Sequence, residues 1–369
     1  MESPIWSHLK LGELFTYNHF TPLINFICLI LEFPITLIRH NNKFCHSCDI
    51  PYFFASVFTA EDVREIPKPE LSFVGDKSEE LSQIEVSLEE VLELIEKLNS
   101  NKSPGPDGIH PRVLKELKYE IVELLTMVCN LFFESATVPN DWKIANVMPV
   151  FKKGSRGDPG NYRPVSLTSV PVKLVETIVK NKIVRHIEEH KLLSKSQHGF
   201  CKGRACLTNL LEFFEGVNKH VDKGDPVDIV HLDFQKAVDK VPHQRLLCKL
   251  SCHGVRGKVL SWIENCLKDR EQRVGINGKF SEWRGVTSGV PQGSVLGPIL
   301  FNSFLNDLEK GVNSEVAKFA DDTKLLKIVK TKADCEELQK DLTNLSDWAT
   351  KWQMKFNEDK CKVMHTGKK

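Results

Sequence analysis

Two short apolar segments that each lead to aspartate constrain the fold of this chain more than any other feature. Residues 227–234 are rich in β-branched side chains, which predicts a buried strand with Asp233 at its end. Residues 316–329 predict a hairpin with Asp321 and Asp322 at its turn. Carboxylates at the ends of buried strands cost free energy unless a cation or a hydrogen bond compensates them. If the strands lie side by side in one sheet, the aspartates meet although 88 residues separate Asp233 from Asp321.

Such a cluster of carboxylates suits phosphoryl transfer. Carboxylates hold Mg²⁺ together with substrate phosphates, and two such ions about 3.5–4 Å apart bind the attacking and the leaving oxygens. By itself, an Asp-Asp pair in a turn is usually only turn chemistry. The hypothesis of a metal site therefore depends on both segments coming together.

The composition is that of a globular protein with a mixed fold. Of 369 residues, 41% are hydrophobic and 27% are charged, which excludes a disordered tail, a collagen, a polytopic membrane protein and a disulfide miniprotein. Few strands are separated by many helices, which favours an α+β domain over a sandwich. Helices are expected at 88–98, 111–134, 171–190, 243–252, 258–267, 294–308 and 335–352. Strands are expected at 227–234 and 361–365, with hairpins at 272–286 and 316–329.

Local signals support several of these elements. Ser87 and Glu90 form a capping box at the start of the first helix, and Pro111 suits the first position of the second. Asn277-Gly278 is a typical hairpin turn. Loops are expected at 99–108, 152–163 and 288–293.

Charge is segregated along the chain although the net charge is only +1. Residues 61–98 contain twelve acids and four bases, whereas residues 142–204 contain thirteen bases and four acids, a local net charge of +9. A basic segment of this size can hold a polyanion. A solvated basic face is an equal alternative on charge alone.

The cysteines indicate an intracellular protein. Eleven are scattered along a chain without a cleavable secretory signal, which predicts reduced thiols in the nucleus or the cytoplasm. Cys45 and Cys48, with His40 nearby, have half of a zinc-site spacing, but no second pair follows them. A structural metal there is therefore disfavoured.

Residues 1–51 differ in texture from the rest of the chain. Their apolar run at 20–38 has 19 residues, close to the length of a membrane span. Glu32 and the prolines Pro22 and Pro34 interrupt it. A charged residue near the centre of a membrane span costs free energy, and a proline inside a helix breaks it. A fortuitous apolar leader is therefore favoured over a membrane anchor.

Seven motifs carry a resemblance to a known family. Three of them resemble motifs A, B and C of a reverse transcriptase: LDFQKAVDKVPH (232–243), SGVPQGSVLGPILF (288–301) and FADD (319–322). Four more narrow the resemblance to the RNA-directed DNA polymerases of jockey-like non-LTR (LINE-type) retrotransposons: NKSPGPDGIHP (101–111), GNYRPVSLTS (160–169), SQHGFCKGRACLTNL (196–210) and KFNEDKCKVMHTG (355–367). The resemblance covers about residues 52–369.

The resemblance implies a right-hand polymerase of the α+β class. Residues 52–226 would form an N-terminal extension and the fingers, and residues 227–369 a palm with a ferredoxin-like antiparallel sheet. Residues 1–51 are too short for the endonuclease of full-length members and are expected to be an unrelated leader. Most of a thumb is expected to be missing after Lys369.

The resemblance also implies roles for individual residues. Asp233 and Asp321 would bridge the Mg²⁺ ions, for which Mn²⁺ could substitute, with Asp322 in support. Lys360 falls where the superfamily places a general acid for the leaving pyrophosphate, although a solvated lysine is an equal alternative.

The nucleotide site is implied in the same way. Gln292 would line the sugar of the nucleotide, and Lys152 and Arg163 would clamp its triphosphate. Phe234 and Val238 belong to the same nucleotide-binding set. Family members usually carry an aromatic residue at the position of Val238, where it excludes a 2′-hydroxyl.

Three hypotheses follow from the sequence. The first is an active polymerase whose partners are an RNA template, a DNA primer and deoxynucleoside triphosphates, with no dedicated protein partner identifiable. The second is a catalytically weak or silent remnant that only binds nucleic acid. The third is a protein tethered to a membrane by its leader. The intact carboxylates, PQG motif and basic residues favour the first hypothesis at the level of chemistry. The expected lack of a thumb favours the second at the level of processivity, so weak, distributive synthesis is expected at most.

Overall fold

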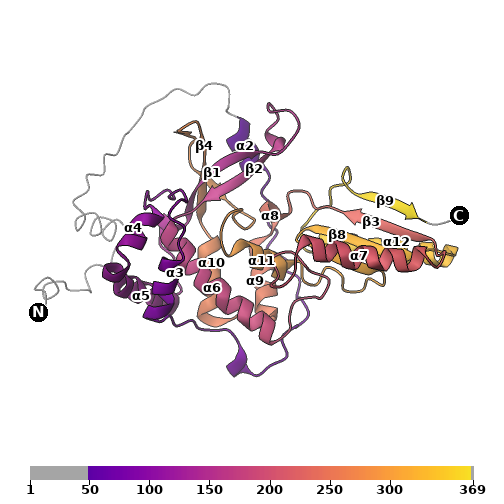
Figure 1. Ribbon diagram of the computed structural model, residues 1–369, viewed down its shortest axis with the longest axis horizontal. Helices are drawn as coiled ribbons and strands as arrows, with labels where there is room; N and C mark the ends of the chain where they lie inside the picture. The colour runs from indigo at the N-terminus through magenta and orange to yellow at the C-terminus, as the bar shows by residue number, and fades with distance from the viewer. Residues whose placement is uncertain (1–48, 367–369) are drawn as a thin grey trace, which may run out of the picture.

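Helices surround two separate β-sheets in the computed structural model, which describes residues 49–366 (Figure 1). The helices are α2 Asp49–Ser56, α3 Leu88–Glu96, α4 Pro111–Glu116, α5 Lys118–Ser135, α6 Val170–Glu189, α7 Cys206–Val221, α8 Ala237–Lys240, α9 His243–Cys252, α10 Gly257–Leu267, α11 Gly297–Phe304 and α12 Lys332–Lys351. The strands are β1 Ile144–Phe151, β2 Tyr162–Leu167, β3 Val227–Leu232, β4 Arg270–Ile276, β5 Lys279–Phe280, β6 Arg284–Val286, β7 Glu315–Phe319, β8 Asp322–Ile328 and β9 Lys362–Thr366. This mixture of helices and strands confirms the α+β class.

The start of α3 follows the sequence signal in part. The side chain of Ser87 accepts a hydrogen bond from the Glu90 backbone N–H at 3.2 Å, as expected of an N-cap. The Glu90 carboxylate lies 3.6 Å from the Lys182 ammonium, so tertiary pairing replaces the second half of the expected capping box. Val91 and Ile95 of α3 are buried in the core.

The helix expected at 111–134 is divided in two. Pro111 occupies the first turn of α4 as predicted, but Leu117 leaves the helical conformation and separates α4 from α5. Leu117 caps both helices, and its N–H still donates to the carbonyl of Val113. The apolar periodicity carries no signal for this break, because both helices present apolar faces to one core.

The first sheet has the strand order β2-β1-β4-β5, and β6 also pairs with β4. β1 runs antiparallel to β2 and parallel to β4. Pro149 of β1 pairs directly with Pro164 of β2. This hairpin was not expected from the sequence, since proline is rare inside sheets. The predicted turn at Asn277-Gly278 is confirmed, with φ of 50° and 77° at the two residues.

The second sheet has the strand order β7-β8-β3-β9 and is antiparallel throughout. The predicted strand, hairpin and terminal strand are all present in it. α7 lies across one face, where Phe213 and Val217 pack on Val227, Ile229 and Leu326 (Figure 1). α7 was not expected from the sequence. The opposite face belongs to the main core, to which α12 contributes (Figure 1).

The main hydrophobic core extends over both halves of the described chain, from Phe73 to Met354. In addition, β4, β5 and β6 follow residue 227 in the chain but pair within the first sheet, beside β1. The division of the chain at residues 226 and 227 stays a prediction.

The leader and its features lie largely outside the described residues. These include the apolar run at 20–38 and the spacing of His40, Cys45 and Cys48. Among residues 49–366, no helix is long and apolar enough to cross a membrane. The eight cysteines within the same range are free thiols.

Candidate active site

The three predicted carboxylates meet at one end of the second sheet. β3 ends at Leu232, which pairs with Thr323 of β8. The same register continued by one residue sets Asp233 opposite Asp322. Asp321 lies in the two-residue turn between β7 and β8, since Phe319 pairs with Asp322 across it. Strand pairing thus brings together residues that are 88 positions apart, as the sequence predicted.

Asp321 lies in the electrostatic field of its neighbours. Burial raises the pKa of Asp321, and the carboxylates of Asp322 and Asp233 raise the pKa further, whereas Lys360 opposes this. A group of mutually repelling carboxylates favours a compensating cation. One such cation is already present, because the Lys360 ammonium donates to Asp233 Oδ2 at 2.7 Å.

The backbone holds Lys360 in this position. The N–H of Gln235 donates to the carbonyl of Lys355 at 2.8 Å, and the N–H of Asn357 donates to the carbonyl of Asp233 at 2.7 Å. The segment that carries Lys360 is therefore fastened to the end of β3. This places the predicted general acid beside a predicted metal ligand.

The carboxylates of Asp233 and Asp321 are ligands of the kind used by a metal ion that takes its remaining ligands from substrate and water. Within residues 49–366, no group of three or more His, Cys, Asp and Glu side chains is arranged so that it could hold a metal ion by itself. Mg²⁺ typically uses one or two carboxylates and completes its octahedron with phosphates and water. Asp233 and Asp321, which lie within electrostatic range of each other at the end of the sheet, could supply those carboxylates.

Basic side chains adjoin the carboxylates. Burial lowers the pKa of Lys236; Asp239 opposes this effect, and the cations Lys360 and Lys152 reinforce it. The Lys236 ammonium also donates to the carbonyl of Gly160, at 3.4 Å, in the loop after β1. Lys236, which the sequence analysis did not single out, therefore links the carboxylate site to the basic loop that carries Lys152.

Gln292 is held in place by a second residue that the sequence analysis missed. Its amide nitrogen donates to Asp239 Oδ1 at 2.8 Å. Asp239 is buried, and desolvation raises its pKa while the bond from Gln292 lowers it. Both residues line a pocket together with Ser166 of β2 and Val290. The pocket thus lies between the PQG loop and the first sheet.

The remaining nucleotide-site candidates differ in exposure. Val238 is half-buried, and its carbonyl accepts from the Val290 N–H at 3.0 Å. Phe234 is 1% exposed and its ring stacks on Phe356, so the ring lies in the core and is not accessible to a nucleotide. Lys152 and Arg163 are both exposed. Arg163 pairs with Val150 in the β1–β2 hairpin, and no contact in the described structure links it to the carboxylates.

A further residue holds the turn that carries Asp321. Gln197 Oε1 accepts from the N–H groups of Gly199 at 2.8 Å and Ala320 at 2.9 Å. Its amide nitrogen donates back to the Ala320 carbonyl at 3.2 Å. Residues 196–210 resemble a family motif, but the motif alone gives no role for Gln197, because its partner lies 123 positions away.

The profile of the reverse transcriptase (RNA-dependent DNA polymerase) family matches residues 150–369. The chain therefore belongs to the reverse transcriptase family. It is 30% identical over 294 residues to the probable RNA-directed DNA polymerase from transposon BS of Drosophila melanogaster, which covers 74% of this chain and 31% of the relative. It is 30% identical to the RNA-directed DNA polymerase from mobile element jockey of the same species, over 75% of this chain and 31% of the relative.

A more divergent relative is the Pol polyprotein from the type-2 retrotransposable element R2DM of Drosophila melanogaster, at 27% identity over 77% of this chain and 27% of the relative. The chain spans about a third of the length of the first two relatives. These similarities confirm the resemblance to jockey-like and other non-LTR retrotransposon sequences.

Proposed function

We propose that this chain forms the polymerising part of an RNA-directed DNA polymerase, which extends a DNA primer on an RNA template with deoxynucleoside triphosphates. The observation that carries the proposal is the grouping of Asp233, Asp321 and Lys360 at the end of one sheet. Membership of the reverse transcriptase family supports template and primer binding.

The topology of the second sheet supports its assignment to a polymerase palm. Along the chain, the elements of this sheet come in the order β3, helices, β7, β8, α12 and β9. In space, its strands lie in the order β7-β8-β3-β9. That is the connectivity of the ferredoxin-like fold. We assign the first sheet, with its β1–β2 hairpin, to the fingers.

Asp233 and Asp321 would hold Mg²⁺, or Mn²⁺ in its place, with Asp322 in support. The bound ions would activate the primer hydroxyl and neutralise charge on the triphosphate. The repulsion between Asp321 and its two neighbouring carboxylates favours binding of such cations. Aligning the primer hydroxyl with the α-phosphate is the contribution of the protein itself.

The basic residues beside the carboxylates would bind the triphosphate. Lys152 and Lys360 both lie within electrostatic range of Lys236. Arg163 extends the basic surface along β2. Lys360 would leave Asp233 when substrate binds and donate a proton to the leaving pyrophosphate.

Gln292 and Val238 would contact the sugar of the incoming nucleotide. Asp239 accepts one hydrogen of the Gln292 amide, which fixes the orientation of that side chain. The Val238 backbone is held against the PQG loop by the bond from Val290. The sugar pocket would therefore be assembled from two segments that hydrogen bonds already join.

The proposal is tested by primer extension with the full chain on an RNA template. We expect incorporation of deoxynucleotides that stops when the divalent metal is chelated and resumes with Mg²⁺ or Mn²⁺. Tight binding of RNA–DNA hybrid without any incorporation would instead identify a protein that only binds nucleic acid. Such binding should weaken with salt by about 0.9 log units per log unit of salt for each phosphate contact.

A further inference from the structure

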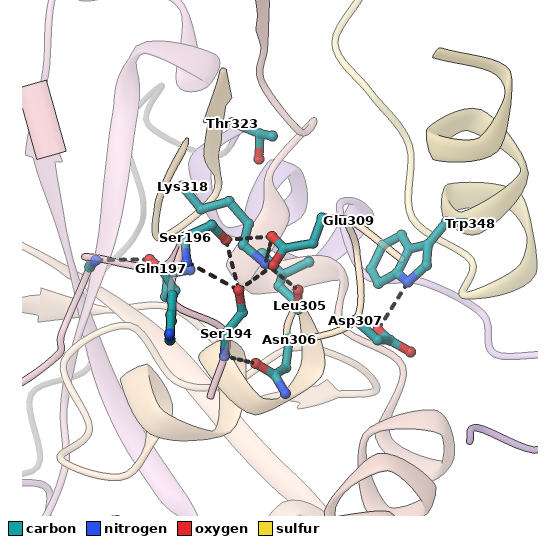
Figure 2. Close-up of polar contacts among 12 residues, drawn as sticks. Ser194, Ser196, Gln197, Leu305, Asn306, Asp307, Glu309, Lys318, Thr323 and Trp348 are labelled. Atoms are coloured by element: carbon teal, nitrogen blue, oxygen red, sulfur yellow. Dashed lines mark hydrogen bonds and ion pairs between the residues drawn. The ribbon is translucent and has the colours of Figure 1, made fainter. Parts of the chain in front are cut away.

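Lys318 is a charged residue that is buried within a strand of the second sheet. It lies in β7, three positions before Asp321, and is 0% exposed. Burying an ammonium is costly unless an opposite charge and hydrogen bonds compensate it. The Lys318 ammonium lies 2.8 Å from Glu309 Oε2 and 3.4 Å from the carbonyl oxygen of Leu305 (Figure 2).

Glu309 connects this lysine to a third part of the chain. It lies in the turn after α11, and its carboxylate accepts hydrogen bonds from the hydroxyls of Ser194 and Ser196 (Figure 2). Asn306 in the same turn accepts from the Ser194 N–H at 2.8 Å. Burial alone would raise the pKa of Glu309, but Lys318 and the two hydroxyls hold that pKa below its ordinary value.

Residues 194–199, here named the strap, continue from these serines to the turn that carries Asp321. The N–H of Lys318 donates to the Ser196 carbonyl at 2.8 Å, and the N–H of His198 donates to the Lys318 carbonyl at 2.9 Å. Gln197 then binds both backbone polar groups of Ala320. A Cβ on Gly199 would lie 2.4 Å from the Ala320 nitrogen, so the strap touches the turn directly.

We infer that the buried Lys318–Glu309 ion pair is a positioning element that fixes the strap and, through it, the turn carrying Asp321. Lys318 contacts neither Asp233 nor Asp321, so it acts through the strap and is not a metal ligand. The inference rests on the proposed function for its kinetic consequence, because a misplaced Asp321 matters only if Asp321 is used in catalysis. Misplacing a reacting group by about 1 Å can cost about a hundredfold in rate.

The test compares Lys318→Met with a matched control, Arg245→Met. Arg245 is also buried and paired, with Glu61 at 3.2 Å, and its other partners are the backbones of Asp62, Glu65 and Lys351. None of these belongs to the strap or to the turn. Both variants should lose stability because each leaves a partly or largely buried carboxylate without its cationic partner.

The kinetics are measured under conditions in which each variant is folded. Lys318→Met should then lower kcat about tenfold to a hundredfold and raise the Mg²⁺ concentration needed for the half-maximal rate. The KM for nucleotide should change little. Arg245→Met should keep both values. The double variant Lys318→Met/Glu309→Gln leaves no buried charge unpaired, so stability should recover while kcat stays low. Recovery of kcat together with stability, or equal kinetic losses in the two single variants, would overturn the inference.

Hydrogen exchange gives a second readout without metal or substrate. In Lys318→Met and in the double variant, the amides of Ala320 and His198 should exchange faster than in the wild type, whereas Arg245→Met should leave both protected. Unchanged protection in the Lys318 variants would refute a positioning role. If the wild type incorporates no nucleotide, the proposed function fails, and hydrogen exchange still decides the inference.

Discussion

Val238 occupies the position where the resemblance leads us to expect an aromatic ring under the sugar. The valine is half-buried beside the PQG loop and removes most of the bulk that would exclude a 2′-hydroxyl. An apolar pocket without a steric clash rejects an added hydroxyl by about a hundredfold at best. We therefore predict that the protein admits ribonucleotides readily.

Val238→Phe tests this prediction. The variant should restore selection for deoxynucleotides while keeping their incorporation similar or better. The measurement is the ratio of kcat/KM for ribo- and deoxynucleotides with the same primer and template. An equal ratio in wild type and variant would mean that residue 238 is not the gate for the 2′-hydroxyl.

His253 makes stability depend on pH. Asn306 donates to His253 Nε2 at 3.1 Å, so this nitrogen accepts and the ring is neutral. His253 Nδ1 is buried and has no hydrogen-bond partner in the described structure. Burial lowers the pKa of His253 to about 4. Below the unfolded pKa of about 6.5, the unfolded state binds the extra proton, so stability falls as the pH drops.

The loss between pH 6.5 and pH 4 should approach about 3 kcal/mol for this one group, because each pKa unit is worth about 1.4 kcal/mol. Urea unfolding across that range measures it. His253→Gln cannot take up the proton, so its stability should depend less steeply on pH than that of the wild type. Parallel curves for the two proteins would contradict the assignment.

At the residue scale, the sequence located the groups with local signals and missed those defined by distant contacts. The carboxylates could be predicted because aspartate at the end of an apolar strand is conspicuous in the sequence itself. Asp239 and Gln197 could not, because their functions depend on partners 53 and 123 positions away. Lys236 stood inside a recognised motif, but only the fold brings it beside Gly160.

At the scale of elements, the loop at 99–108 is locked against the start of α6. A Cβ on Gly105 would lie 2.5 Å from the backbone nitrogen of Ser169 and 2.6 Å from the carbonyl carbon of Thr168. Because backbone atoms cannot move aside cheaply, Gly105→Ala should destabilise the protein by about 1–3 kcal/mol.

Urea unfolding checks this prediction against Gly285→Ala. Gly285 lies in β6, and a Cβ there would meet no atom within 4 Å. The control should therefore stay close to the wild type. Comparable losses at the two positions would show that the contact with Ser169 does not matter.

Elements with local signals could be predicted, including the start of α3 at Ser87 and the turn between β4 and β5 at Asn277-Gly278. The β1–β2 hairpin could not, because paired prolines obscure its strand character. The break between α4 and α5 is set by tertiary packing and leaves no mark on the apolar period.

At the scale of the whole molecule, one core joins parts that the motifs present as separate modules. The second sheet shares this core with helices from both halves of the chain. The first sheet combines β1 and β2 with strands from residues 270–286. The motifs could predict the family and several elements, but not that strands from distant parts of the chain share one sheet. No local pattern indicates which distant strands pair.

We propose that the carboxylates at the end of the second sheet support nucleotide transfer. The most direct measurement is Mg²⁺-dependent extension of a DNA primer on an RNA template by the full chain, beside Asp321→Asn and Asp347→Asn. Asp321→Asn keeps the shape of the side chain but removes its charge, whereas Asp347 is exposed on α12 and has no contact with the carboxylates in the described structure. We expect Asp321→Asn to abolish incorporation and Asp347→Asn to keep it. Equal incorporation by Asp321→Asn and the wild type would contradict this proposal.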